Sequence, residues 1–292
     1  MFNCQGRLFT FGCSFTQYHW PTWADILGRK FEYYENWGKV GAGNQYIFNA
    51  LIECHLRNQF TKDDTVIIMW TSYNREDRYI NNMWQTPGGL SNQNFYDESF
   101  ISKYYDHRGS LIRDFISIKA AIDLLDFWGV NYRLLSMVPF NNNSLYQIDA
   151  DLLTLFNSVI KSIKISAYEI LYNNSWWLPK FRSDFSSTVN KEQHMNLLEN
   201  QFNQSSGTDW PSFSDFLADN IDNKFRSEIE EFGLFQIRDH AIRVDNHPIP
   251  TEHLSYLNTV LPEFKISLET EEWINNYIMF DKFNTHRPTN RL

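Results

Sequence analysis

Five residues spread along this chain have the types that nucleophilic catalysis at a carbonyl requires: Ser14, Gly43, Asn74, Asp245 and His247. A serine nucleophile needs a base within hydrogen-bond reach, and that base needs a carboxylate that fixes its tautomer. We expect His247 to be the base and Asp245 to orient it. An oxyanion needs preorganised donors, and the backbone N–H groups of Ser14 and Gly43 with the side-chain amide of Asn74 are the candidates.

The elements before these residues predict that they meet. Residues 7–12 form a candidate strand, Ser14 follows it, and a helical pattern covers 21–29. A serine between a strand and a helix has its hydroxyl and nearby N–H groups directed at the same point. Asn74 follows the continuous apolar run 65–70, which is typical of a strand covered on both faces. The carboxyl ends of parallel strands share one crevice, so these residues should converge there.

The alternation of strand and helix patterns predicts an α/β fold with a parallel sheet and right-handed crossovers. We expect a second strand within 31–40, a loop over 80–96, a strand over 132–138, and helices over 45–58, 97–128 (ending at Gly129), 149–162 and 251–260. The segment 170–235 breaks this rhythm with Trp176-Trp177, Trp210-Pro211 and short helical patterns at 213–219 and 222–232. The predicted organisation is an α/β core (1–169 and 236–267), an aromatic-rich insertion or cap (170–235) and a C-terminal helix and tail (268–292).

Each of these signals also has a purely structural explanation. Ser14 could belong to an ordinary turn, Gly43 to a strand-to-helix turn, and Asn74 could cap the next segment. His247 could be an incidental loop residue. The run from Arg75 to Arg78 is expected to be a solvated loop. The functional interpretation therefore depends on all the signals together.

Composition narrows the class of protein. The chain has 292 residues, 42% of them hydrophobic, which indicates one large globular domain or a domain with an insertion. A formal charge of -9 argues against nucleic acid as the main partner. No apolar run is long enough to cross a bilayer, and Arg7 and Gly12 interrupt any signal peptide. Cys4, Cys13 and Cys54 have no CxxC spacing, so neither a disulfide framework nor a metal site is indicated.

Four motifs resemble, in order, the sequence blocks of the SGNH (GDSL-type) hydrolases: Gly12-Cys13-Ser14, Gly43-Asn44, Asn74 in Ser72-Tyr73-Asn74-Arg75, and Asp245-x-His247-Pro248. The resemblance spans residues 8 to about 260 and leaves 170–235 and the tail unmatched. It implies a flavodoxin-like three-layer α/β/α sandwich and ester hydrolysis through an acyl-serine intermediate. It also implies that no metal or organic cofactor is needed, and that the substrate is a lipid, acyl-thioester or acetylated-carbohydrate ester.

The chain departs from the family pattern at three places. Cys13 replaces the usual Asp before the serine, and the third block lacks its glycine and aspartate, so that Asn74 precedes Arg75. Asp245 lies two residues before His247 rather than the commoner three, which keeps Asp239 as the alternative orienting carboxylate. The "GCSFT" stretch resembles divergent members from marine phages and bacteria.

Two functions from different classes follow. The first is a serine esterase, with an O-acetyl or acyl group on a carbohydrate as the candidate ester and with Arg75, His19 and Trp20 as candidate substrate contacts. The second is a catalytically degraded SGNH-fold module that assembles into a virion or surface structure or an oligomer. In both cases we expect a cytoplasmic or virion-associated protein that binds neither nucleic acid nor membrane.

Overall fold

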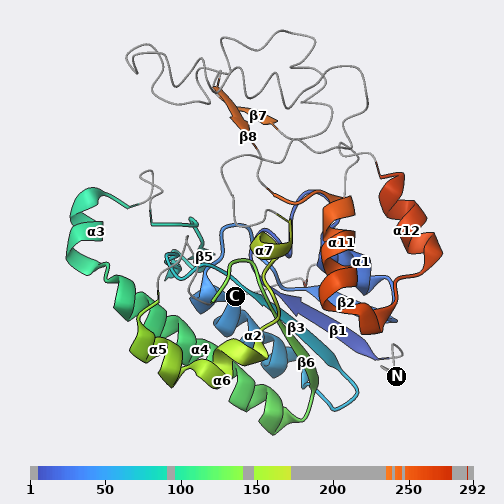
Figure 1. Ribbon diagram of the computed structural model, residues 1–292, viewed down its shortest axis with the longest axis horizontal. Coiled ribbons are helices and arrows are strands. Elements are labelled where there is room, and N and C mark those ends of the chain that lie inside the picture. Colours follow the sequence, from blue (N-terminus) through green and yellow to red (C-terminus); the bar gives the residue numbers. More distant parts are fainter. Residues whose placement is uncertain are drawn as a thin grey trace. The chain divides into compact units, whose positions relative to one another are not determined.

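Four parallel strands form the central sheet of the computed structural model, in the order β2-β1-β3-β6 (Figure 1). They are β1 (Arg7–Phe11), β2 (Tyr33–Asn36), β3 (Thr65–Trp70) and β6 (Asn131–Ser136). The structure describes residues 6–90, 96–140, 148–171, 235–238, 241–244, 247–277 and 288. The inner strand β3 is buried along its whole length, because neighbouring strands and helices cover it on every side. The predicted α/β class with a parallel sheet is confirmed.

A single parallel bridge continues the sheet beyond β6. The backbone N–H of Lys164 donates to the carbonyl of Leu134 at 2.9 Å, and Ile163 forms the bridge with Leu134. The segment that carries Ile163 therefore lies in the position of a fifth strand, although only one bridge is formed.

Helices flank the sheet. They include α1 (Trp23–Gly28), α2 (Asn44–Asn58), α4 (His107–Trp128), α11 (Pro250–Val260) and α12 (Leu268–Asn275). Helix α2 packs on α4, while α11 packs on both α1 and α12. β2 follows β1 in the sequence and lies on one side of it, whereas β3 and β6 lie on the other side. The direction of the connections therefore reverses between β1 and β3. Ligands of open α/β sheets bind at the carboxyl side of such a reversal. None of the described helices is long and apolar enough to span a membrane.

Two predicted helices are each divided in the structure. The predicted helix 97–128 consists of α3 (Glu98–Tyr104) and α4, because the Asp106 side chain accepts the N–H of Gly109 and starts a new helix. The helix predicted over 149–162 consists of α5 (Ala150–Leu155) and α6 (Asn157–Ser162). Gly129 ends α4 with a φ of 67°, which confirms the predicted C-terminal glycine.

The predicted loop over 80–96 contains a β-hairpin that the sequence analysis missed. Strands β4 (Arg78–Ile80) and β5 (Met83–Gln85) pair antiparallel. Asn81 and Asn82, with φ values of 53° and 58°, connect them. Two successive residues at positive φ are characteristic of a type I′ turn, whose twist matches that of the two strands it joins. Asparagine tolerates positive φ better than most residues. The remaining short elements near the core are α7 (Ala167–Leu171) and the 3₁₀ helix η1 (Pro262–Phe264).

The chain divides into two compact units. The first comprises Met1–Asn174, Pro248–Tyr277 and Lys282–Leu292, and the second comprises Ser175–His247 and Ile278–Asp281. In the second unit the structure describes an antiparallel hairpin of β7 (Phe235–Arg238) and β8 (Ala241–Val244). The sequence analysis assigned 236–247 to the core, whereas this division groups those residues with the second unit. The helices predicted at 213–219 and 222–232 lie outside the described residues.

Candidate active site

Ser14 lies in a tight turn directly after β1. The carbonyl of Cys13 accepts the N–H groups of Thr16 and Gln17 at 2.9 and 3.1 Å, which closes the turn. A Cβ atom on Gly12 would lie 2.0 Å from the Thr16 hydroxyl, so this position requires glycine. Ser14 is only 4% exposed, and its hydroxyl makes no hydrogen bond to any described residue. The hydroxyl is thus held at the carboxyl end of β1 without an intramolecular partner in the described part of the chain.

A buried polar network fixes this turn from the side of β2 and α1. The Thr16 carbonyl accepts both the Asn36 amide, at 2.7 Å, and the Thr22 hydroxyl, at 2.6 Å. The Asp25 carboxylate in turn accepts the Thr22 N–H at 3.0 Å. Because every member of this network is buried, the turn has little freedom to move. None of these side chains carries a sequence signal that predicts a place in the site.

Gly43 lies at the N-terminus of α2, and its N–H group already has an acceptor. It donates to Asp77 at 2.8 Å, and the other Asp77 oxygen accepts the N–H of Tyr46 at 2.8 Å. Asp77 is buried, which corrects the prediction that the Arg75–Arg78 run is a solvated loop. Burial raises the pKa of Asp77, while the two backbone hydrogen bonds oppose that shift. One of the three expected oxyanion donors is therefore occupied by a carboxylate in this structure.

Asn44, the residue after Gly43, holds two loops of the site together. Its amide group donates to the Thr71 carbonyl and to Asp114, at 3.0 and 2.7 Å, and its oxygen accepts the Thr71 N–H at 2.8 Å. Asp114 on α4 also pairs with Arg113 at 2.9 Å, and burial raises its pKa to about 6. Asn44 is thus a structural residue that links α2, the loop after β3, and α4.

Asn74 is half-buried in the loop after β3. Its side-chain oxygen accepts the Ser72 hydroxyl at 2.7 Å, and its backbone carbonyl accepts the N–H of Leu90 at 2.9 Å. The amide nitrogen makes no hydrogen bond to a described residue. The Ser72 contact therefore orients the amide and leaves its N–H₂ group available to a ligand.

The sulfur of Met137, just after β6, is a shared contact of these loops. It lies 3.5 Å from the Cys13 sulfur, 3.6 Å from the Thr71 hydroxyl and 3.7 Å from the Arg75 guanidinium. Arg75 also donates to the Ala42 carbonyl at 2.8 Å. The segments that contain Ser14, Gly43 and Asn74 therefore converge at one edge of the sheet, as the strand pattern predicts. Sequence alone gave no signal for Met137.

The other expected contact residues occupy different environments. His19 is exposed, whereas Trp20 is buried and donates its indole N–H to the carbonyl of Pro248 at 2.8 Å. Pro248 is the residue after His247 and begins the segment leading into α11. His253, inside α11, is buried with its ring 6.4 Å from that of Phe15. The segment between Pro248 and His253 thus packs against the residues around Ser14.

His247 itself belongs to the second unit and is half-buried, and Asp245 and Asp239 lie outside the described residues. The expected pairing of Ser14 with His247, and the identity of the orienting carboxylate, stay predictions. Within the described ranges, no group of three or more His, Cys, Asp or Glu side chains could hold a metal ion.

No protein-family model matches the chain, and a search of curated proteins finds no significant match.

Proposed function

We propose that the chain is a serine esterase of the SGNH type, acylated at Ser14 by its substrate. The observation that carries the proposal is the convergence of three segments. The Ser14 turn and the Asn74 loop both contact the Met137 sulfur, and the Gly43 turn is joined to the Asn74 loop through Asp77 and Arg75. The strand order β2-β1-β3-β6, with Ile163 in the next position, supports a flavodoxin-like core, whose order is 2-1-3-4-5.

The proposed reaction has two halves. The Ser14 hydroxyl attacks the ester carbonyl and passes its proton to His247, which Asp245 orients. The tetrahedral intermediate then expels the alcohol, which takes the proton from His247 and leaves an acyl group on Ser14. Water then attacks this acyl group and gives a proton to His247, which passes it to the Ser14 oxygen as the bond to the acyl group breaks and the carboxylic acid product leaves. No metal or organic cofactor takes part in this scheme.

The oxyanion of each intermediate needs donors that are already in place. The Asn74 amide supports this role, because Ser72 orients it while its N–H₂ group is available. The Ser14 N–H is the second proposed donor. The Gly43 N–H serves only if the Asp77 carboxylate releases it, and a single oxyanion donor is worth about 10²–10³ in rate.

The proposed substrate is an ester of a carbohydrate, such as an O-acetyl group. Arg75 is the proposed contact for a polar or anionic substrate group, because its guanidinium contacts the Ala42 carbonyl and the Met137 sulfur and forms no ion pair with a described carboxylate. His19 is exposed and stays a candidate contact. For Trp20 we propose a positioning role instead, since its indole N–H is already used by Pro248.

One observation favours the second candidate, a catalytically inactive module for virion or surface assembly. The hydrogen bond between Gly43 and Asp77 removes a donor that the esterase mechanism uses. In this alternative the buried Ser14 has a structural role and the chain acts through binding.

Labelling with a fluorophosphonate probe separates the two functions. The probe phosphonylates an activated serine, and intact-protein mass spectrometry measures the adduct on the full chain. We expect wild type to be labelled, Ser14→Ala and His247→Ala to lose the label, and the exposed-serine control Ser102→Ala to keep it. A folded wild type that takes no label would overturn the esterase proposal and favour the assembly module.

A further inference from the structure

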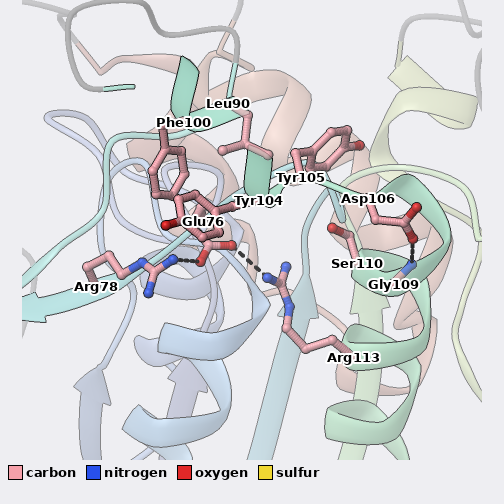
Figure 2. A pocket seen from close by; sticks show the side chains of 10 residues that line it. All are labelled: Glu76, Arg78, Leu90, Phe100, Tyr104, Tyr105, Asp106, Gly109, Ser110 and Arg113. Atoms are coloured by element: carbon pink, nitrogen blue, oxygen red, sulfur yellow. Dashed lines mark hydrogen bonds and ion pairs between the residues drawn. The ribbon is translucent and has the colours of Figure 1, made fainter. Parts of the chain in front are cut away.

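A cavity of about 170 Å³ lies between the loop after β3 and the start of α4 (Figure 2). Its lining combines charged, hydroxyl and aromatic side chains, among them Glu76, Arg78, Tyr104, Tyr105, Ser110 and Arg113. Pockets for drug-sized ligands have volumes of about 300–1,000 Å³. This cavity therefore has the size for a single small ring.

The charges around the cavity balance. Glu76 lies between Arg78 and Arg113, forming ion pairs of 2.7 Å with each, as Figure 2 shows. Asp106 adds a second carboxylate, so two cations and two anions line the cavity. An anionic ligand would meet the carboxylates and a cationic ligand would meet the guanidinium groups. The electrostatics therefore favour a neutral ligand.

The polar groups require a ligand that both donates and accepts hydrogen bonds. Carboxylates only accept and guanidinium groups only donate, so a ligand group that satisfies both is a hydroxyl or an amide. Ser110 lies in the cavity wall, is 8% exposed, and its hydroxyl makes no hydrogen bond to a described residue. A hydroxyl both donates and accepts, so the Ser110 side chain can form a hydrogen bond with a ligand hydroxyl in the cavity.

Aromatic rings supply the apolar part of the wall. Phe100, Tyr104 and Tyr105 line the cavity. The Phe100 ring already stacks on Tyr96 at 4.9 Å and contacts the Arg78 guanidinium, so Tyr104 and Tyr105 are the rings proposed to contact a ligand. The electron-rich face of an aromatic ring attracts the weakly positive C–H groups on the face of a sugar ring. Side chains of this kind beside neutral, mixed polar groups suit a saccharide.

The polar wall is preorganised. Arg113 donates to Glu76, to Asp114 and to the Arg75 carbonyl, and the Tyr96 hydroxyl donates to the Glu76 carbonyl at 3.0 Å. These contacts hold Glu76 in place before any ligand arrives, which reduces the entropic cost of binding.

We propose that this cavity binds one neutral sugar ring, with its face against Tyr104 and Tyr105 and its hydroxyls on Glu76, Arg78 and Ser110. The proposal does not require Ser14 to be a nucleophile. The cavity shares Leu90 and Glu76 with the loop that carries Asn74, so the bound sugar lies beside that loop.

Saturation-transfer NMR with the methyl glycosides of glucose, galactose, mannose, xylose and N-acetylglucosamine tests the proposal on the full chain. We expect at least one glycoside to bind wild type, and Tyr104→Ala and Ser110→Ala each to weaken its binding, up to about tenfold. Tyr104 is 63% exposed, so its loss should not affect folding, and the matched control Tyr33→Ala, 43% exposed on β2, should bind as wild type.

Two results would overturn the proposal. The first is that none of the glycosides binds folded wild type. The second is that a glycoside binds wild type but binds Tyr104→Ala and Ser110→Ala equally tightly, which would place the sugar outside this cavity. Ser14→Ala should bind the sugar as tightly as wild type, so loss of esterase labelling and loss of sugar binding are separate outcomes.

Discussion

The carboxylate of Asp77 accepts the backbone N–H of Gly43 at 2.8 Å. Its second oxygen accepts the N–H of Tyr46, so one buried side chain satisfies two of the free donors at the start of α2. The negative charge of the carboxylate also interacts favourably with the positive N-terminal end of the helix dipole. Asp77 therefore anchors α2 to the loop after β3, and in doing so it occupies a donor that an esterase would use.

Replacing Asp77 with asparagine should destabilise the fold. The amide keeps one acceptor oxygen but presents an N–H₂ group to the other backbone donor, and the charge at the helix terminus is lost. We expect the free energy of unfolding to fall by about 1–3 kcal/mol in urea denaturation. Asp63→Asn, at an exposed position, is the matched control and should be neutral. An Asp77→Asn protein as stable as wild type would contradict the anchoring role.

The raised pKa of Asp114 should make the stability of the fold depend on pH. Its folded pKa is about 6 against an ordinary value of 3.8, chiefly because burial disfavours the charged form. The folded state therefore binds more protons than the unfolded state between these two values, and this group lowers the free energy of unfolding as pH rises through that window. The shift corresponds to about 3 kcal/mol at 1.36 kcal/mol per pKa unit.

Asp114→Asn removes this titration and isolates its effect. Urea unfolding of wild type and variant at pH 4, 5, 6 and 7 gives the difference in their free energies of unfolding at each pH. Carboxylates that do not interact with Asp114 cancel in this difference, and the coupled Asp77 contributes to it. From pH 4 to pH 7 we expect the free energy of unfolding of the variant, relative to that of wild type, to rise by up to about 3 kcal/mol. A difference that does not change with pH would show that Asp114 titrates normally.

The sequence predicted the elements that periodicity determines. Strand β3 has the expected bounds, 65–70, because a continuous β-branched and apolar run is characteristic of a buried strand. The break between α3 and α4 was missed, although the polar run Asp106-His107-Arg108-Gly109-Ser110 interrupts the apolar pattern and aspartate is a common first residue of a helix. The hairpin of β4 and β5 was also missed, because Asn81-Asn82 is a weaker turn signal than Asn-Gly.

The site was predictable where it depends on strand ends and was missed where it depends on long-range packing. The order of strands brings the segments of Ser14, Gly43 and Asn74 to one edge, as expected. Asp77 lies in a charged run that resembles a solvated loop, and only tertiary structure brings it against Gly43. Met137 is one apolar residue among many, so its central position could not be inferred.

Asn74→Ala should reduce catalysis without affecting the fold. Its side chain is half-buried and makes one hydrogen bond, from Ser72, so we expect the free energy of unfolding to change by about 1 kcal/mol or less. Loss of its proposed oxyanion donation should slow fluorophosphonate labelling of Ser14 by about 10²–10³. Unchanged labelling kinetics would remove Asn74 from the proposed mechanism.

Asn44→Ala, in contrast, should strongly destabilise the fold. The Asn44 side chain is 1% exposed and makes three hydrogen bonds, to Thr71 and Asp114. Its loss leaves buried polar groups unsatisfied, at about 1–3 kcal/mol each. We expect a fall of several kcal/mol in urea denaturation. A stable Asn44→Ala protein with slow labelling would instead indicate that Asn44 acts in the chemistry.

Trp20→Phe should affect Ser14 through the segment that begins at Pro248. The substitution keeps a buried ring but removes the indole N–H that donates to Pro248 at 2.8 Å. An unsatisfied carbonyl should cost about 1–3 kcal/mol of unfolding free energy. If His247, the neighbour of Pro248, is the base, labelling of Ser14 should slow as well.

Trp23→Phe is the matched control, because Trp23 is equally buried but its indole N–H has no acceptor in the described part of the chain. Equal labelling rates in the two variants would show that the contact with Pro248 does not position the base.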